Sequence, residues 1–187
     1  MNGTKVTHKL AASLIIGQLL IFPVVGQEAS YVPRGSAVMI DGKVSPGEWS
    51  DALKVVLSNG VDLLIKRHER FLLVAVVLPP GKYGFTDLLV DENLDLHASA
   101  KLGERVRTAG GAWSDWKWWN NDRWTANVAR VEAFAGPTLS PEGVREYQID
   151  LDRFPEKTIQ LEVFSTIMNG NQRQAEWHSS RMIFNLP

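Results

Sequence analysis

Phe71-Leu72-Leu73-Val74-Ala75-Val76-Val77-Leu78 is the stretch that decides the fold, and Pro79-Pro80-Gly81 ends it. A strand with one face in water would alternate apolar and polar residues. This unbroken apolar run therefore predicts a central strand that is covered on both faces. Just before it, Asn59-Gly60 separates Leu53–Leu57 from Val61–Lys66, which predicts a tight β-hairpin.

Later strands are predicted where apolar and polar residues alternate, in the ranges 129–133, 146–151 and 159–167. In the second of these, Tyr147, Ile149 and Leu151 share one face, with polar residues on the other. Asn169-Gly170 predicts another tight turn, and no segment has the pattern of a long amphipathic helix. The sequence thus predicts an all-β domain, a two-sheet antiparallel β-sandwich of jelly-roll or immunoglobulin-like type with eight to ten strands.

The N-terminus has the layout of a secretory signal peptide. Lys5 and Lys9 precede an apolar run over residues 10–25, and polar sequence begins at Gln27. We expect residues 1–26 to be removed, 27–36 to form a short leader and 37–187 to form a single domain. The run is short for a membrane span, which needs about 20 residues, although a permanent N-terminal anchor is the alternative. The expected location is secreted or periplasmic, with no membrane contact after cleavage.

Composition narrows the possible partners. The chain has no cysteine, so it has no disulfide framework, and its formal net charge is −1. The predicted signal peptide holds two lysines and no acidic residue, so the remainder is slightly more acidic. Because charges are scattered and there is no basic run, nucleic acid and anionic lipid are poor candidates.

Five of the seven tryptophans lie between Trp113 and Trp124, without a Val, Ile, Leu or Met among them. Rigid aromatic faces beside amide and charged groups suit a ligand with apolar faces and polar edges, and sugars fit best. We therefore predict a carbohydrate-binding site in the loop from about Lys101 to Asn127. The alternative is that some of these rings pack over the hydrophobic core of the sandwich. The candidate residues are Trp113, Trp116, Trp118, Trp119, Trp124, Asn120, Asn121 and, near the last strand, Trp177.

One motif resembles a known group. Ile40-Asp41-Gly42-Lys43 followed by Glu48-Trp49-Ser50-Asp51-Ala52 is similar to the opening of family-9 carbohydrate-binding modules and their DOMON-like relatives. The resemblance implies a β-sandwich that binds sugars, often attached to glycoside hydrolases, with calcium in some members. It also implies a first strand that ends at Asp41-Gly42 and a structural Trp49 packed beneath the sandwich. Family-9 modules usually hold a sugar between two tryptophans. Trp177 resembles one of these by position, and its partner could be any ring of the cluster.

Metal and catalytic motifs are sparse. Asp91, Asn93 and Asp95 have a spacing that can place oxygens around calcium, but Leu96 follows and Leu102 stands where an EF-hand needs glutamate. Calcium in a sandwich loop is one reading, and a plain acidic turn is the other. No hydrolase, zinc-protease or nucleotide-binding fingerprint is present, so we expect a protein that is not an enzyme.

Two rival functions stay open. DOMON-like relatives suggest haem binding, which would need axial ligands on opposite walls of an apolar cavity. Residue type alone makes Met39, Met168, Met182, His97 and His178 the candidates. The other rival is an envelope scaffold or adhesion module whose tryptophan loop inserts into a protein partner.

Overall fold

The computed structural model describes residues 29–57, 60–99, 101–118, 124–128, 130–133, 136–139, 144–154, 156–169 and 172–186. For Tyr83, Asn169, Gln174 and residues 124–139, the description covers the backbone alone. The predicted signal peptide, residues 1–26, therefore lies outside the described residues. Within them, no helix has the length and apolar character needed to cross a membrane.

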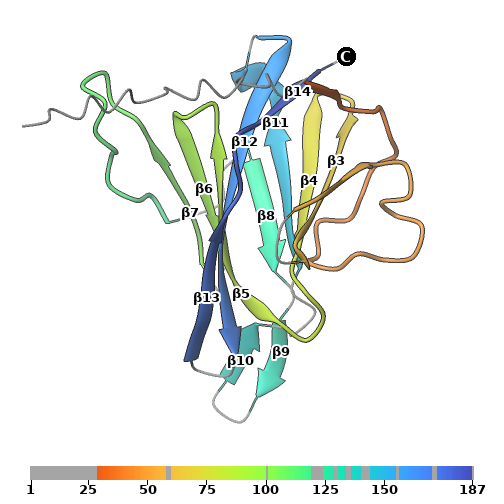
Figure 1. Cartoon of the computed structure of the whole chain (residues 1–187), viewed down its shortest axis with the longest axis vertical. Coiled ribbons are helices and arrows are strands. Elements are labelled where there is room, and N and C mark those ends of the chain that lie inside the picture. Colours follow the sequence, from red (N-terminus) through yellow and green to blue (C-terminus); the bar gives the residue numbers. More distant parts are fainter. Residues whose placement is uncertain are drawn as a thin grey trace, which may run out of the picture.

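Two β-sheets face each other (Figure 1). The larger has the order β1-β14-β12-β5-β6-β7, with β13 also paired to β12. Its strands are β1 (Ser30–Tyr31), β5 (Tyr83–Val90), β6 (Leu94–Ala98), β7 (Leu102–Val106), β12 (Thr158–Asn169), β13 (Gln172–His178) and β14 (Met182–Asn185).

The smaller sheet has the order β2-β3-β4-β11-β8. Its strands are β2 (Leu53–Val56), β3 (Asp62–His68), β4 (Phe71–Val77), β8 (Trp124–Val128) and β11 (Val144–Asp150). A separate hairpin joins β9 (Arg130–Ala133) to β10 (Gly136–Leu139), and a 3-10 turn, η2 (Leu151–Arg153), follows β11. The predicted all-β, two-sheet sandwich is confirmed, with more strands than expected.

The β4 strand is central and buried on both faces, as its unbroken apolar run predicts. It lies between β3 and β11. Leu72, Val74 and Val76 enter the main core between the sheets, whereas Leu73 and Ala75 belong to a second core on the outer side. The predicted pairing of β2 with β3 is also found. The strands on either side of the second predicted turn, β12 and β13, pair with each other as well. Asn59 and Gly170 of the predicted turns lie outside the described residues.

Two buried side chains of β11 connect the sheets. The Tyr147 hydroxyl donates to the Thr86 carbonyl at 3.0 Å, and the Arg145 guanidinium donates to the Gly84 carbonyl. Both side chains are fully buried, and burial lowers the pKa of Arg145 to about 10. These bonds satisfy polar groups that would otherwise destabilise the interior.

The expectation that residues 27–36 lie outside the domain is wrong for most of this segment. Ser30–Tyr31 pairs with β14, and this pairing is parallel in an otherwise antiparallel sheet. Val32 is fully buried in the main core, and Gly35 N donates to the Arg67 carbonyl at 2.9 Å. The segment is too short to show a strand period, so its sequence gives no sign of these partners.

Residues 33–52 cover the outer face of the smaller sheet, and Trp49 anchors them. This segment is the orange loop beyond β3 and β4 in Figure 1. Trp49 is 5% exposed and packs with Leu73, Ala75 and Val144. Its indole N–H donates to Glu146 Oε1 at 3.0 Å. The structural role expected for Trp49 is therefore confirmed.

The same carboxylate holds the Asp41-Gly42 turn. Glu146 Oε2 accepts from Asp41 N at 3.0 Å and from Gly42 N at 2.8 Å, while Gly42 has a φ of 82°. Residues 35–40 form no strand, contrary to the strand that the family resemblance implies. Their backbone is held by side chains instead, as in the bond from Met39 N to Glu48 Oε1 at 2.7 Å.

A buried lysine provides a second anchor for this covering segment. Lys66 on β3 is fully buried, and its Nζ lies 2.6 Å from Asp51 Oδ1 and 2.7 Å from the Glu48 carbonyl oxygen. Its ammonium also lies 5.4 Å from the centre of the Trp49 ring. Hydrogen bonds from Lys66 and Ser36 hold the pKa of Asp51 far below its usual range. A charged residue can be buried here because its donors are matched by acceptors.

We expect Trp49→Ala to lower the free energy of unfolding by about 3–5 kcal/mol, the range for deleting a large buried aromatic side chain. Trp49→Phe keeps most of the packing but leaves Glu146 Oε1 without its donor, so its cost should be smaller, about 1–3 kcal/mol. Urea denaturation of both variants measures the difference. An unchanged midpoint for Trp49→Ala would mean that the ring does not anchor the segment.

Stability should also depend on the charge of Glu146. Burial raises the pKa of this carboxyl from 4.5 to about 7, despite its three N–H donors. The folded state therefore keeps a proton that the unfolded state releases between these values. The contribution of Glu146 is complete below about pH 4.5 and is lost as the pH rises to about 7. We expect Glu146→Gln to remove this part of the pH dependence of the free energy of unfolding, which urea denaturation from pH 4.5 to 8 would measure. A variant whose free energy of unfolding changes with pH as the parent's does would contradict this expectation.

Candidate functional site

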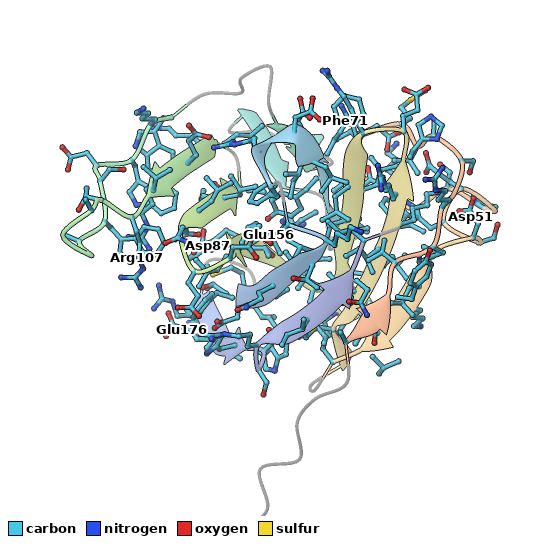
Figure 2. The ribbon with its side chains drawn as sticks, turned by 90° about the horizontal axis from the view of Figure 1, so that it is seen from above. Asp51, Phe71, Asp87, Arg107, Glu156 and Glu176 are labelled. Carbon is cyan, nitrogen blue, oxygen red and sulfur yellow. The ribbon has the colours of Figure 1, made fainter. Side chains whose placement is uncertain are left out.

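The outer face of the larger sheet carries a set of aromatic and charged side chains. Alternation along the strands sends Leu88, Val90 and Leu96 into the core and their neighbours to the opposite face. Figure 2 shows Arg107, Asp87 and Glu176 on one side of the molecule, opposite the side that carries Asp51. The candidate site lies here, away from the covering segment of residues 33–52.

One row of side chains crosses this face perpendicular to the strands. Pairing places His178 opposite Phe164, Phe164 opposite Asp87, and Asp87 opposite His97. Gly103 on β7 then pairs with His97. Because paired residues point to the same side of a sheet, these five positions form one line from β13 to β7. We call it the cross-strand row: His178, Phe164, Asp87, His97 and Gly103.

His97 links the row to the tryptophans. Its Nδ1 lies 2.5 Å from Asp87 Oδ1, and its Nε2 lies 2.9 Å from Ser99 Oγ. Its ring also meets the rings of Trp116 and Trp118 edge-on, with centroid distances of 5.7 and 5.5 Å. Both ring nitrogens are therefore occupied, and the imidazole is fixed against the two indoles.

Residues 107–118 return along the edge of β7 rather than forming a free loop. Glu104 and Lys117 exchange two backbone hydrogen bonds of 2.9 and 2.8 Å, and Ser114 N donates to the Val106 carbonyl at 2.8 Å. Lys117 is exposed, and its neighbours Trp116 and Trp118 both lie against Gly103. This segment is the green loop beside β7 in Figure 1. It covers a sheet edge that would otherwise expose unpaired backbone groups.

The tryptophans of this segment form a stack with two arginines. The guanidinium of Arg105 lies 4.8 Å from the centroid of Trp113 and 4.5 Å from that of Trp116, and Arg107 covers Trp113 at 4.5 Å. Trp116 then stacks on Trp118, with centroids 5.3 Å apart and planes 25° apart. We call this the arginine–tryptophan stack, in the order Arg107, Trp113, Arg105, Trp116, Trp118.

Trp118 ends the stack and is 49% exposed. Trp113 and Trp116 are each covered by stacking partners and are only partly exposed. Among the described residues, Trp118 is therefore the tryptophan that offers a free ring face. Since Trp116 and Trp118 touch, no sugar fits between them, and the two-tryptophan sandwich implied by the family resemblance is absent from this pair.

Asp95 fixes Arg105 within the stack. Its Oδ2 accepts from Arg105 Nη2 at 2.7 Å and from Nε at 2.8 Å, and its side chain is 6% exposed. Burial and the nearby Asp87 raise the pKa of Asp95 to about 6, although Arg105 opposes this. Holding an arginine flat between two indoles in this way contributes about 0.5–2 kcal/mol per contact.

The same face of the sheet also has a hollow of about 380 Å³. Phe85 and Asp87, which both contact His97, form part of its wall. Phe164 and His178 form another part, and their rings stack with centroids 3.8 Å apart and planes 9° apart. The remaining lining residues are Ser165, Thr166, Glu176 and Trp177.

A larger hollow, of about 750 Å³, lies near the turn of residues 43–46, on the other side of the molecule. Val44, Pro46, Leu78, Pro80 and other mainly small or apolar residues line it, and none of its described lining residues is aromatic. It therefore lacks the combination of ring faces and converging polar groups that marks the smaller hollow.

The structure places the predicted tryptophans differently from one another. It brings Trp113, Trp116 and Trp118 together. Trp119, Asn120 and Asn121 lie outside the described residues, and only the backbone of Trp124 is described, in β8 of the other sheet. The prediction that Trp177 adds to an exposed platform needs correction. It is 7% exposed and packs in the main core, because it pairs with inward-facing Ser165, so only a small part of it lines the hollow.

The predicted calcium ligands are largely engaged with protein groups. Asp91 Oδ1 accepts from Gln160 N at 2.7 Å, and Asp95 Oδ2 is paired with Arg105. Asn93 is exposed in the turn between β5 and β6. No group of three His, Cys, Asp or Glu side chains suited to a metal occurs in the described part of the chain. Calcium stays a prediction that these contacts do not support.

The residues named for haem do not share a pocket. Met39 is 70% exposed on the covering segment, while Met182 is buried in the main core. His97 has both ring nitrogens bonded, and His178 Nε2 lies 2.9 Å from Glu162 Oε2. Both histidines are therefore engaged with other side chains of the protein.

Asp87, His97 and Ser99 are linked in the order of a hydrolase charge relay. In a hydrolase the serine oxygen must be free to attack a substrate. Ser99 Oγ instead accepts from Lys101 N and donates to the Lys101 carbonyl oxygen, each at 3.2 Å, and these bonds close the turn between β6 and β7. We therefore assign these three residues to positioning of the aromatic rings.

Sequence reasoning missed Asp87, Phe164 and the contacts of His97 and His178. These residues come from four strands and meet through the pairing register, which no local motif encodes. Comparisons with protein-family models, with curated proteins and with solved structures found no match to this chain.

Proposed function

We propose that this protein is an exported, non-catalytic carbohydrate-binding protein, and that Trp118 and the adjacent hollow hold the sugar. The observation that carries this proposal is the position of Trp118. A half-exposed indole at the end of a fixed stack gives one flat apolar surface, and His97, which it contacts, connects it to Phe85 and Asp87 in the wall of the hollow. Pyranose rings have apolar faces and hydroxyl edges, so they match this combination.

The polar groups in the wall of the hollow support the same proposal. Asp87 and Glu176 supply carboxylate oxygens in the wall of the hollow, and Thr166 supplies a hydroxyl. Sugar hydroxyls donate to such oxygens, and charge-assisted hydrogen bonds are the stronger kind. A bound haem would instead need a deep apolar cavity, which the described residues do not line here.

Export is supported by sequence alone, through the charged and apolar pattern of residues 1–26. The resemblance to family-9 modules is supported by buried Trp49 and by the Asp41-Gly42 turn. The missing strand before this turn and the closed Trp116–Trp118 pair depart from it. The proposal therefore depends on the site more than on the resemblance.

We expect Trp118→Ala to weaken glycan binding about 30-fold, equivalent to about 2 kcal/mol, while the melting temperature stays near that of the parent. The side chain lies at the outer end of the stack and belongs to neither hydrophobic core, so its loss leaves the core packing intact. Tyr31→Ala removes another exposed aromatic ring, at the opposite edge of the sheet, and is the matched control. Glycan-array screening followed by calorimetry measures both.

Either of two results would refute the proposal. One is a parent protein that binds no glycan on the array. The other is glycan binding that Trp118→Ala leaves unchanged. Capture of a protein partner, lost in Trp118→Ala, without glycan binding would favour the adhesion alternative.

Gly103→Ala should displace the platform without deleting it. A Cβ at this position would lie 2.7 Å from Trp118 Cε3 and 3.3 Å from Trp116 Cε3, so the indoles must move. We expect a loss of glycan affinity of about tenfold or more and a shift of the tryptophan fluorescence. Gly110→Ala is the matched control, because a Cβ there meets nothing within 4 Å. Equal effects of the two changes would contradict a specific role for the contact with Gly103.

A further inference from the structure

The cross-strand row is long enough to define how a ligand lies on this face. It passes over β13, β12, β5, β6 and β7 at consecutive paired positions. Neighbouring strands lie about 4.8 Å apart, so four steps span about 19 Å. This length exceeds a single sugar ring several times over.

Aromatic pairs stand at the two ends of the row. At the β13 end, Phe164 is 38% exposed and stacks on His178, whose side chain is 49% exposed. At the β7 end, Trp118 lies over Gly103 and stacks on Trp116. Each pair combines an accessible ring with a neighbour that limits its movement. Two such rings on one face give an elongated ligand two separate stacking positions.

Carboxylate oxygens lie along the row and beside it. Asp87 is in the middle of the row, with its Oδ1 engaged by His97. Glu176 on β13, beside the Phe164–His178 end, adds a second carboxylate to the wall of the hollow, and its Oε1 lies 2.7 Å from Arg173 Nη1. Neither lysine nor arginine is among the described residues that line the hollow. A chain of neutral, hydroxyl-rich rings can donate to these oxygens. A chain of uronate rings would place like charges together, which is unfavourable.

We propose that the ligand is a neutral linear oligosaccharide that lies across the strands, from the Phe164–His178 pair to Trp118. This inference rests on the proposed carbohydrate-binding function and adds the length, direction and charge class of the ligand. Affinity should rise as rings are added until the chain spans the row, because each further stacking contact adds to the first.

Calorimetry with oligosaccharides of increasing length tests the inference. The neutral probes are glucose, xylose and mannose β-1,4-linked oligomers from two to about six rings, and the charged probes are galacturonate oligomers of matched length. We expect one neutral series to gain at least tenfold in affinity from the shortest to the longest member. The galacturonate series should bind more weakly at every length.

Phe164→Ala separates the two ends of the row. We expect it to weaken the longest bound neutral oligomer about tenfold and to leave the disaccharide unchanged, whereas Trp118→Ala should weaken both. Tyr31→Ala controls for the loss of an exposed aromatic ring. Circular dichroism melting of all variants distinguishes a lost contact from a lost fold.

Three outcomes would overturn the inference. They are an affinity that does not depend on chain length, a preference for galacturonate, and equal effects of Phe164→Ala on short and long chains. In each case the protein still binds glycan, so the proposed function survives. Failure to bind any oligosaccharide or glycan would remove the proposed function and this inference together.

Discussion

Burial of both faces of β4 is the constraint on which the arrangement of the molecule depends. Its unbroken apolar run needs a second cover besides the facing sheet, and residues 33–52 supply it. Two buried ionisable side chains, Glu146 and Lys66, attach this cover by binding backbone groups and Trp49. The smaller sheet is thereby closed on its outer side, and the larger sheet keeps the face that carries the candidate site.

The arginine–tryptophan stack follows from simple periodicity on that larger sheet. Residues two apart in an extended chain point to the same side. Arg105 therefore shares a face with Gly103, and Trp116 shares one with Trp118. Gly103 has no side chain, so the indoles can lie directly on the sheet. The outcome is a rigid support for Trp118, which ordinary loop residues would not provide.

Much of the fold could be predicted from the sequence because strand patterns are local. The central position of β4, the inward face of β12 and the β2–β3 pairing all follow from apolar spacing and turn residues. Glu146 could not be predicted as buried, because its alternation with Tyr147 and Ile149 points it to the outer face. That face is buried only because residues 33–52, which are distant in sequence, cover it. Likewise, Ser30–Tyr31 joins the sheet through a partner at the far end of the chain.

The candidate site could be predicted in part, for a related reason. The density of tryptophans marks residues 113–118, but it does not reveal which ring is left free. That depends on Arg105 and Arg107, which cover two of the rings, and on Gly103, which lets two of them lie against the sheet. Asp87 and Phe164 come together only through the register of β5 with β12. The burial of Trp177 depends in the same way on the register of β12 with β13, which places it opposite Ser165.

A fixed platform with one free indole has a consequence for binding energetics. Ordering a side chain on binding costs about 0.5–1.5 kcal/mol for each mobile group. Trp118 is already held by Trp116, His97 and Gly103, so little of this cost remains for the ligand to meet. A single stacking contact still yields only modest affinity, in the millimolar to micromolar range. Stronger binding therefore requires further contacts on the same ligand, and the cross-strand row places Phe164 where a longer chain can reach it.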